Sequence, residues 1–166
     1  GFERLSIPEI AEVADVNKTS IYRRWPTKAD LVRAALTHSI EDHARDIPDM
    51  GSLRGDLVAL ARVVGEYVTS PRGMGVIRTV FADGQNPEVR AMAGTIWQEG
   101  AGASIPFLII ERALARGELP ENADLPLVLF TMAGAIMHRV FVERAEVDGD
   151  FIGRLVDLVL HGALRR

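Results

Sequence analysis

The stretch that decides the fold is residues 5–31, LSIPEIAEVADVNKTSIYRRWPTKADL. Apolar residues at helical spacing predict one short helix over residues 6–14 and a second over residues 18–24. The residues between them break the first helix, and Asn17 is a favourable N-cap for the second. Two short helices joined by a tight turn are the elements of a helix-turn-helix.

Capping patterns set the limits of these helices. Ser6 followed three residues later by Glu9 predicts a capping box at the start of the first helix. Thr27 followed by Asp30 predicts a weaker box that opens a longer helix over residues 28–45. The chain therefore begins with two short helices and one long one.

Charge is distributed unevenly along the chain. The net charge is −4, which argues against a protein that coats nucleic acid through a general basic field. Residues 17–28 nevertheless contain no acid and hold four cations, including the only two lysines in the sequence. Residues 1–33 carry 6 basic and 5 acidic side chains, against 13 and 18 in the rest. This pattern indicates a small module that faces an anion, attached to an acidic body, although a solvated basic helix face is the alternative.

The second helix has two distinct faces. Ile21 and Trp25 are spaced i, i+4 and are expected to point toward a core. Thr19 can offer its hydroxyl or methyl group to a base edge, whereas Tyr22 is better placed for a phosphate or for packing. Lys28, at the start of the next helix, also suits a phosphate. The candidate DNA-binding residues are Lys18, Thr19, Tyr22, Arg23 and Lys28.

The rest of the sequence keeps a helical pattern, and no run alternates as a strand would. We therefore predict an all-α fold with two domains, a helix-turn-helix head over residues 1–46 and a larger helical body over residues 47–166. Gly100, Gly102 and Pro106 are expected to kink the longest helix. The helices predicted in the body span residues 53–69, 73–82, 87–115, 124–144 and 150–164.

The motif over residues 5–31 is similar to the DNA-binding signature of TetR/AcrR transcription regulators. Residues 115–119 and the apolar helix that contains Gly134 are similar, less specifically, to the regulatory part of such proteins. Asp15 stands where the family usually has glycine, but aspartate tolerates the left-handed backbone that the turn requires. The family also has a helix before the position of Gly1 that buttresses the head, and we expect this helix to be missing from the sequence. The resemblance implies DNA contacts at the five candidate residues.

Two helices near the end of the chain are apolar on more than one side, which indicates a surface for a partner. The resemblance implies an intersubunit four-helix bundle, a homodimer with two-fold symmetry and a near-palindromic double-stranded DNA operator. The candidate interface residues are Val128, Met132, Ala135, Phe151, Leu155, Leu158 and Gly162.

A ligand cavity is expected between the head and these helices, lined mainly by apolar and methionine side chains that suit an apolar molecule. Trp97 and His138 would be its polar handles, although His138 could instead bond a neighbouring carbonyl. Arg78 could pair an acidic ligand or an internal carboxylate. The candidate pocket residues are Arg78, Phe81, Met92, Trp97, Phe107, Met132 and His138.

Enzymatic chemistry has little support in the sequence. There is no cysteine, the four histidines are far apart, and no glycine-rich phosphate loop follows a strand. We expect no metal and no cofactor. The longest apolar stretch, residues 125–137, is shorter than the roughly 20 residues that span a bilayer, so a cytoplasmic location without membrane contact is expected.

The functional expectation is a sequence-specific DNA-binding transcriptional regulator that responds to a ligand, with repression as the expected outcome. The alternative is a helical small-molecule binding protein without specific DNA binding, which would leave the acid-free window and Tyr22 unexplained.

Overall fold

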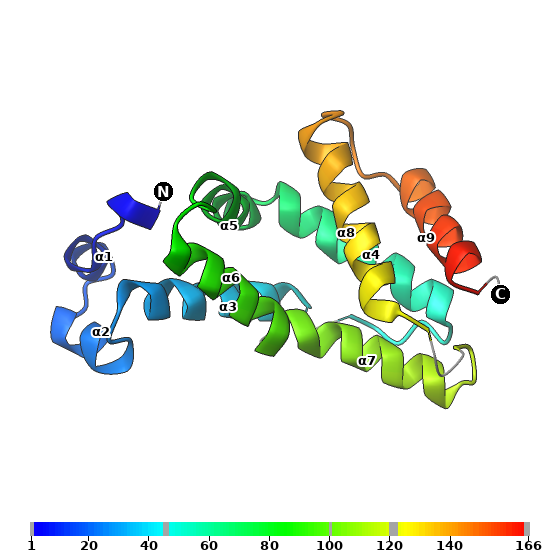
Figure 1. Ribbon diagram of the computed structural model, residues 1–166, viewed down its shortest axis with the longest axis horizontal. Coiled ribbons are helices and arrows are strands. Elements are labelled where there is room, and N and C mark those ends of the chain that lie inside the picture. The colour runs from blue at the N-terminus through cyan, green and yellow to red at the C-terminus, as the bar shows by residue number, and fades with distance from the viewer. Residues whose placement is uncertain (1, 45–46, 100, 120–122, 165–166) are drawn as a thin grey trace.

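The computed structural model describes residues 2–44, 47–99, 101–119 and 123–164. Helices make up all the regular structure in these ranges, which confirms the all-α prediction (Figure 1). A head of short helices lies at one end, and longer helices form the body at the other. The elements are η1 (Phe2–Arg4), α1 (Ile7–Val13), α2 (Lys18–Arg24), α3 (Lys28–Ala44), α4 (Leu53–Thr69), α5 (Pro71–Ala82), α6 (Pro87–Glu99), α7 (Ala101–Ala115), α8 (Leu125–Phe141) and α9 (Gly149–Leu164).

The helix starts test the capping predictions. At α3 the box is confirmed, because the Thr27 amide donates to Asp30 Oδ2 at 3.2 Å and the Asp30 amide donates to Thr27 Oγ1 at 3.1 Å. At α1 the box is wrong, because the Ser6 side chain makes no capping hydrogen bond. The 3₁₀ turn η1 was not predicted.

Two helix limits differ from the expectation for local reasons. Helix α5 begins at Pro71, two residues early, because the Ser70 hydroxyl accepts from the Gly73 amide at 3.0 Å and proline is tolerated in a first turn. Helix α8 ends at Phe141, and Arg144 has a left-handed φ of 55°, which no helix can include.

The long helix expected over residues 87–115 is described as α6 and α7, which follow one course in Figure 1. Gly100 separates them and lies outside the described residues, whereas Gly102 and Pro106, the other two residues expected to kink the helix, lie within α7.

Helix α4 lies at the centre of the body, between α7, α8 and α9. Leu57 and Ala61 on α4, Ile136 on α8 and Val156 on α9 have no exposed surface and belong to one apolar cluster. Burying a leucine, isoleucine or valine side chain contributes roughly 1.5–3 kcal/mol, so this cluster supplies much of the stability of the body.

A buried carboxylate sits at the start of α4. Asp56 is fully buried and accepts a hydrogen bond from Arg116 Nη2 at 2.6 Å and one from the Met50 amide at 2.8 Å. A buried charge is tolerated only when it is paired and hydrogen-bonded, and Asp56 is both.

Arg116, just after α7, also contacts Asp49 at 3.0 Å and Glu118 at 3.3 Å. The hydrogen bond from the Gly51 amide and the charge of Arg116 hold the pKa of Asp49 below its ordinary value. The Glu118 carboxylate in turn accepts from the Leu53 amide at 2.5 Å, at the first residue of α4. One guanidinium therefore fastens the end of α7 to the start of α4.

Replacing Arg116 by alanine should lower the free energy of unfolding by about 3 kcal/mol, because the Asp56 charge would stay buried without its cation. Urea unfolding followed by circular dichroism at 222 nm measures this change.

The matched control is Arg154→Ala, because Arg154 pairs with Asp150 on α9 with 71% and 80% of the two side chains exposed. Its loss should cost less than about 1 kcal/mol. Equal losses for the two variants would contradict the role assigned to Arg116.

Candidate nucleic-acid interface

The head has a small core of its own beneath α1 and α2. Ile7, Ala11 and Ile21 are buried together, with Trp25 and Leu31 packed against them. The inward direction expected for Ile21 and Trp25 is confirmed. This packing fixes the angle between the two helices, as a helix-turn-helix requires.

The turn between the helices is built from non-glycine residues. Asp15 has a φ of 52°, the left-handed conformation that the sequence analysis expected at this position. Asn17 then caps α2, because its Oδ1 accepts from the Thr19 amide at 2.8 Å. Helix α2 therefore begins where the sequence predicts.

The outer face of α2 is open to solvent. Lys18, Thr19, Tyr22 and Arg23 are all exposed, and 45% of the Tyr22 surface is accessible. Tyr22 therefore does not belong to the core of the described chain. All four side chains are accessible to a ligand that lies along α2.

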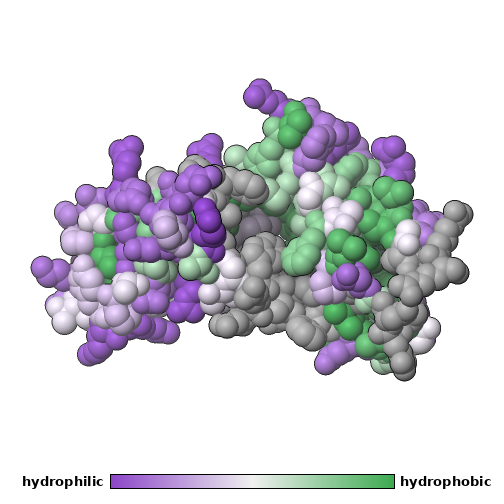
Figure 2. All heavy atoms as spheres, in the orientation of Figure 1, coloured by the Kyte–Doolittle hydropathy of each residue, from purple (hydrophilic) through white to green (hydrophobic). Residues whose placement is uncertain are grey.

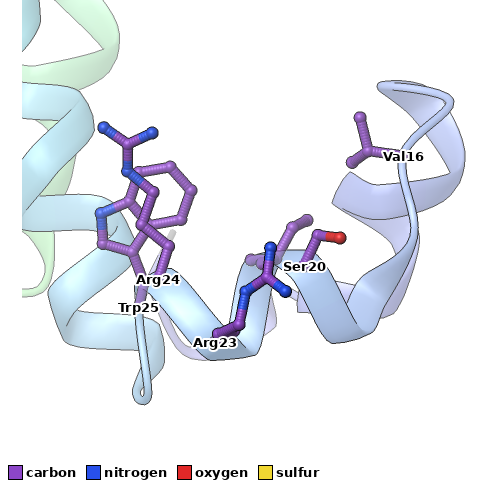
Figure 3. Close-up of a pocket in the computed structure, with 6 residues that line it drawn as sticks. Val16, Ser20, Arg23, Arg24 and Trp25 are labelled. Atoms are coloured by element: carbon purple, nitrogen blue, oxygen red, sulfur yellow. The ribbon is translucent and has the colours of Figure 1, made fainter.

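A hollow of about 520 Å³ lies beside α2, lined by Val16, Ser20, Ile21, Arg23, Arg24 and Trp25 (Figure 3). The Arg24 guanidinium lies over the Trp25 ring, 5.1 Å from its centroid. In the described part of the chain, neither arginine forms an ion pair with a carboxylate. Arg24 was not among the candidates, because residue type and spacing fit a solvated neighbour equally well.

Lys28 lies at the start of α3 and is half-buried. Its Nζ lies 4.5 Å from the centroid of the Phe2 ring and donates to the Glu3 carbonyl oxygen at 3.4 Å. No ion pair with a carboxylate is found for it among the described residues. No local sequence pattern indicates that η1 supports Lys28, because the two segments are far apart along the chain.

The other end of the molecule has a different surface. Figure 2 shows hydrophilic residues around α1 and α2 and hydrophobic residues over α8 and α9. The exposed large apolar side chains of α8 and α9 include Leu127 at 60%, Phe130 at 55% and Leu158 at 71%. This is the apolar surface of the two helices that the sequence analysis expected to meet a partner.

The individual interface residues need correction. Val128, Met132 and Leu155 are buried in the core of this chain, because they lie on the helix faces that pack against α4. Ala135 and Phe151 are partly buried against the same core. Of the seven candidates, the exposed ones are Leu158 and Gly162.

The candidate pocket residues do not gather around one described cavity. Met92 lies in the cluster at the base of the head, whereas Met132 lies in the core of the body. Arg78 is exposed on α5. The side chains of Phe81, Trp97 and Phe107 lie outside the described part of the structure.

His138 also departs from the expectation. With 60% of its side chain exposed, it lies on the surface of α8, and its Nδ1 is 3.2 Å from Glu143 Oε1. The ring cannot serve as a polar handle inside this chain, because the inward face of α8 is occupied by Met132 and Ile136.

Within the described ranges, no three metal-ligating side chains gather into a group that could hold a metal ion. In the same ranges, no helix is long and apolar enough to cross a membrane.

Comparison with known proteins agrees with this geometry. Residues 1–35 match the family model for bacterial regulatory proteins of the tetR family. Residues 47–159 match the model for the tetracyclin repressor-like C-terminal domain. The two matches together cover the head and most of the body.

Relatives match over nearly the full chain. The HTH-type transcriptional regulator AqdR of Rhodococcus erythropolis is 30% identical over 98% of this chain and 77% of its own length. The DNA-binding transcriptional repressor TetR of Mycobacteroides abscessus is 32% identical over 96% of this chain and 83% of its own. The crystal structure of the TetR family transcription regulator SCO0332 superposes with a TM-score of 0.74 at 25% identity, covering 99% of this chain and 90% of that one.

Proteins of this kind bind DNA, function as dimers and are not enzymes. On the strength of both family models and of these relatives, the chain belongs to the TetR family of DNA-binding transcriptional regulators.

Proposed function

We propose that this regulator is a ligand-responsive repressor, a homodimer that binds a near-palindromic operator through α2 and leaves it when a small apolar molecule binds the body. The observation that carries the DNA contact is the outer face of α2, where exposed cations that have no carboxylate partner among the described residues lie beside an exposed threonine and tyrosine. Uncompensated cations at a surface are what phosphate neutralisation requires.

The dimensions of α2 suit a major groove. At about 1.5 Å per residue its seven residues extend roughly 10 Å, and a major groove is about 12 Å wide. Thr19 lies in the first turn, where recognition helices contact base edges. Tyr22, Arg23 and Lys28 lie further along and at the start of α3, where they suit the phosphates on either side.

The dimer is proposed to form through the outer faces of α8 and α9. Leu127, Leu158 and the exposed Gly134 and Gly162 support this, because they form an apolar surface that lets helices approach closely. A two-fold axis through this surface would make the two copies of α2 equivalent, as a near-palindromic operator requires, and successive major grooves lie about 34–36 Å apart.

Ligand response is proposed to act through α3, which leads from the head into the body. Helix α3 packs against α4, α6 and α7 of the body, and burial raises the pKa of the Tyr67 phenol on α4. A ligand that changes the packing of the body would therefore move α3 and the head with it. The repressor role is supported by the name of the M. abscessus relative, a DNA-binding transcriptional repressor.

The first test is DNA binding itself. A duplex selected from random sequence with the full chain should bind at least about 10³-fold more tightly than a scrambled duplex, with two protomers for each site. Fluorescence anisotropy at several salt concentrations measures both affinities. Equal, weak binding to both duplexes would favour the alternative, a helical carrier of small molecules.

Two matched variants test whether the outer faces of α8 and α9 form the dimer interface. Leu158→Glu should abolish the two-protomer complex, because a charge would be buried against the partner. Leu114→Glu changes a leucine that is 46% exposed on α7 and should leave the complex intact. A dimer unaffected by Leu158→Glu in sedimentation would place the interface elsewhere.

A second prediction distinguishes a contact with phosphate from a contact with a base edge. Lys28→Ala should weaken binding to every sequence and lower the slope of log affinity against log salt by about 0.9 for each head. Thr19→Ala should instead change the preferred bases at its position and keep the slope. Equal effects of both variants on selected and scrambled DNA would contradict this division.

A third prediction concerns release. A molecule found by its ability to dissociate the labelled duplex should change the distance between the two α2 helices of the dimer, because only a difference between two arrangements can alter operator affinity. Spin labels at Ser20 measure the distance between the two α2 helices with and without the molecule. Labels at Gln85 measure the distance between the two α5–α6 turns under the same conditions. Unchanged spacing between the heads would exclude the mechanism.

A further inference from the structure

The short helix η1 is wedged between the head and the body (Figure 1). The Phe2 ring is 2% exposed and packs with Val32 and Leu36 of α3 and with Val89 and Met92 of α6. A side chain buried between two elements moves only when one of them moves. The position of η1 is therefore set jointly by the helix that leads to the head and by a helix of the body.

Two hydrogen bonds tie η1 to the turn between α5 and α6. The Phe2 amide donates to Asp83 Oδ2 at 2.5 Å, and Asn86 Nδ2 donates to Glu3 Oε1. The second contact fixes the carboxylate of Glu3, a side chain that is otherwise exposed. The turn therefore controls where the negative charge of Glu3 lies.

Asn86 has two separable roles. Its Oδ1 accepts from the Glu88 amide at 2.8 Å and from the Val89 amide at 3.4 Å, which caps α6. Its Nδ2 makes the contact with Glu3. Since one oxygen caps the helix and the nitrogen holds the carboxylate, a substitution can remove the second role and keep the first.

The same segment supports Lys28. The ammonium of Lys28 lies over the Phe2 ring and donates to the main-chain oxygen of Glu3 at 3.4 Å, whereas the Glu3 carboxylate is turned to Asn86. If this carboxylate were released, it would find the nearby ammonium, which has no carboxylate partner among the described residues. A carboxylate on Lys28 would compete with a DNA phosphate for the same cation.

We propose that Asn86 is a positioning residue for DNA binding: by holding the Glu3 carboxylate at the α5–α6 turn, it keeps Lys28 available for a phosphate. This inference rests on the proposed contact of Lys28 with DNA. It makes the α5–α6 turn a control point, because a shift of α5 against α6 that separates Asn86 from Glu3 lowers DNA affinity without any change in α2.

The variant that tests this is Asn86→Asp, which keeps an oxygen to cap α6 and replaces the amide donor by a second carboxylate that repels Glu3. With the selected duplex and the full chain, affinity should fall about tenfold. The salt slope should also fall by about 0.9 for each head, as for Lys28→Ala, because the lost contact is one phosphate.

Two matched variants separate the contact from the added charge. Gln85→Glu adds the same charge at the neighbouring exposed position and should change affinity by less than about twofold. Asn86→Asp combined with Glu3→Gln restores the wild-type net charge and reverses the donor and the acceptor of the hydrogen bond. This pair should return affinity and slope to within about twofold of the wild type.

The double variant Lys28→Ala with Asn86→Asp should bind no more weakly than Lys28→Ala alone, since both changes remove one contact. The proposal would be overturned if Asn86→Asp lowered affinity further in the Lys28→Ala background, or if the loss of affinity remained when Glu3→Gln was added to Asn86→Asp. An unchanged affinity for Asn86→Asp alone would overturn it too. A wild type that does not prefer its selected duplex would overturn the proposed function instead.

Discussion

The structure depends on the burial of α4. Its apolar face has no exposed surface at Leu57 and Ala61, and this requires cover from α7, α8 and α9 together. Since α8 and α9 turn their richest apolar faces to α4, the outer apolar surface that remains on them is limited to residues such as Leu127 and Leu158. One packing requirement therefore determines the core of the chain and also leaves the surface available to a second copy.

The head joins this body through α3, which packs against α4, α6 and α7, and through η1. Within the body, Arg116 links the end of α7 to the start of α4. At the other end, η1 links the start of α3 to the turn between α5 and α6. Between these points, α3 is the helix that leads from the head into the body. The head is small because its core needs only enough apolar surface to fix the angle between α1 and α2. The rest of the surface of the head can therefore carry charged side chains.

Local sequence was sufficient for the turn and the second helix of the head, but not for the cap of α1 or for the contacts between elements. The limits of α2, the left-handed Asp15 and the capping box at Thr27 follow from spacing and residue type within a few positions. Helical periodicity identifies an apolar face but does not show which element covers it. For this reason Val128 and Met132, predicted at the dimer interface, are found in the core of the chain. The contacts of Phe2 with Asp83 and of Asp56 with Arg116 join residues 60 or more positions apart, and no local pattern indicates them.

The uneven distribution of charge also has a kinetic consequence. Residues 1–33 sum to +1 and the rest of the chain to −5, and the acid-free segment lies at the far end from α8 and α9. A polyanion attracts one end of such a molecule and repels the other, so the field turns the protein before any contact forms. Encounters that begin with the body against the duplex are disfavoured. The acidic body thereby raises the fraction of collisions with DNA in which the head arrives first.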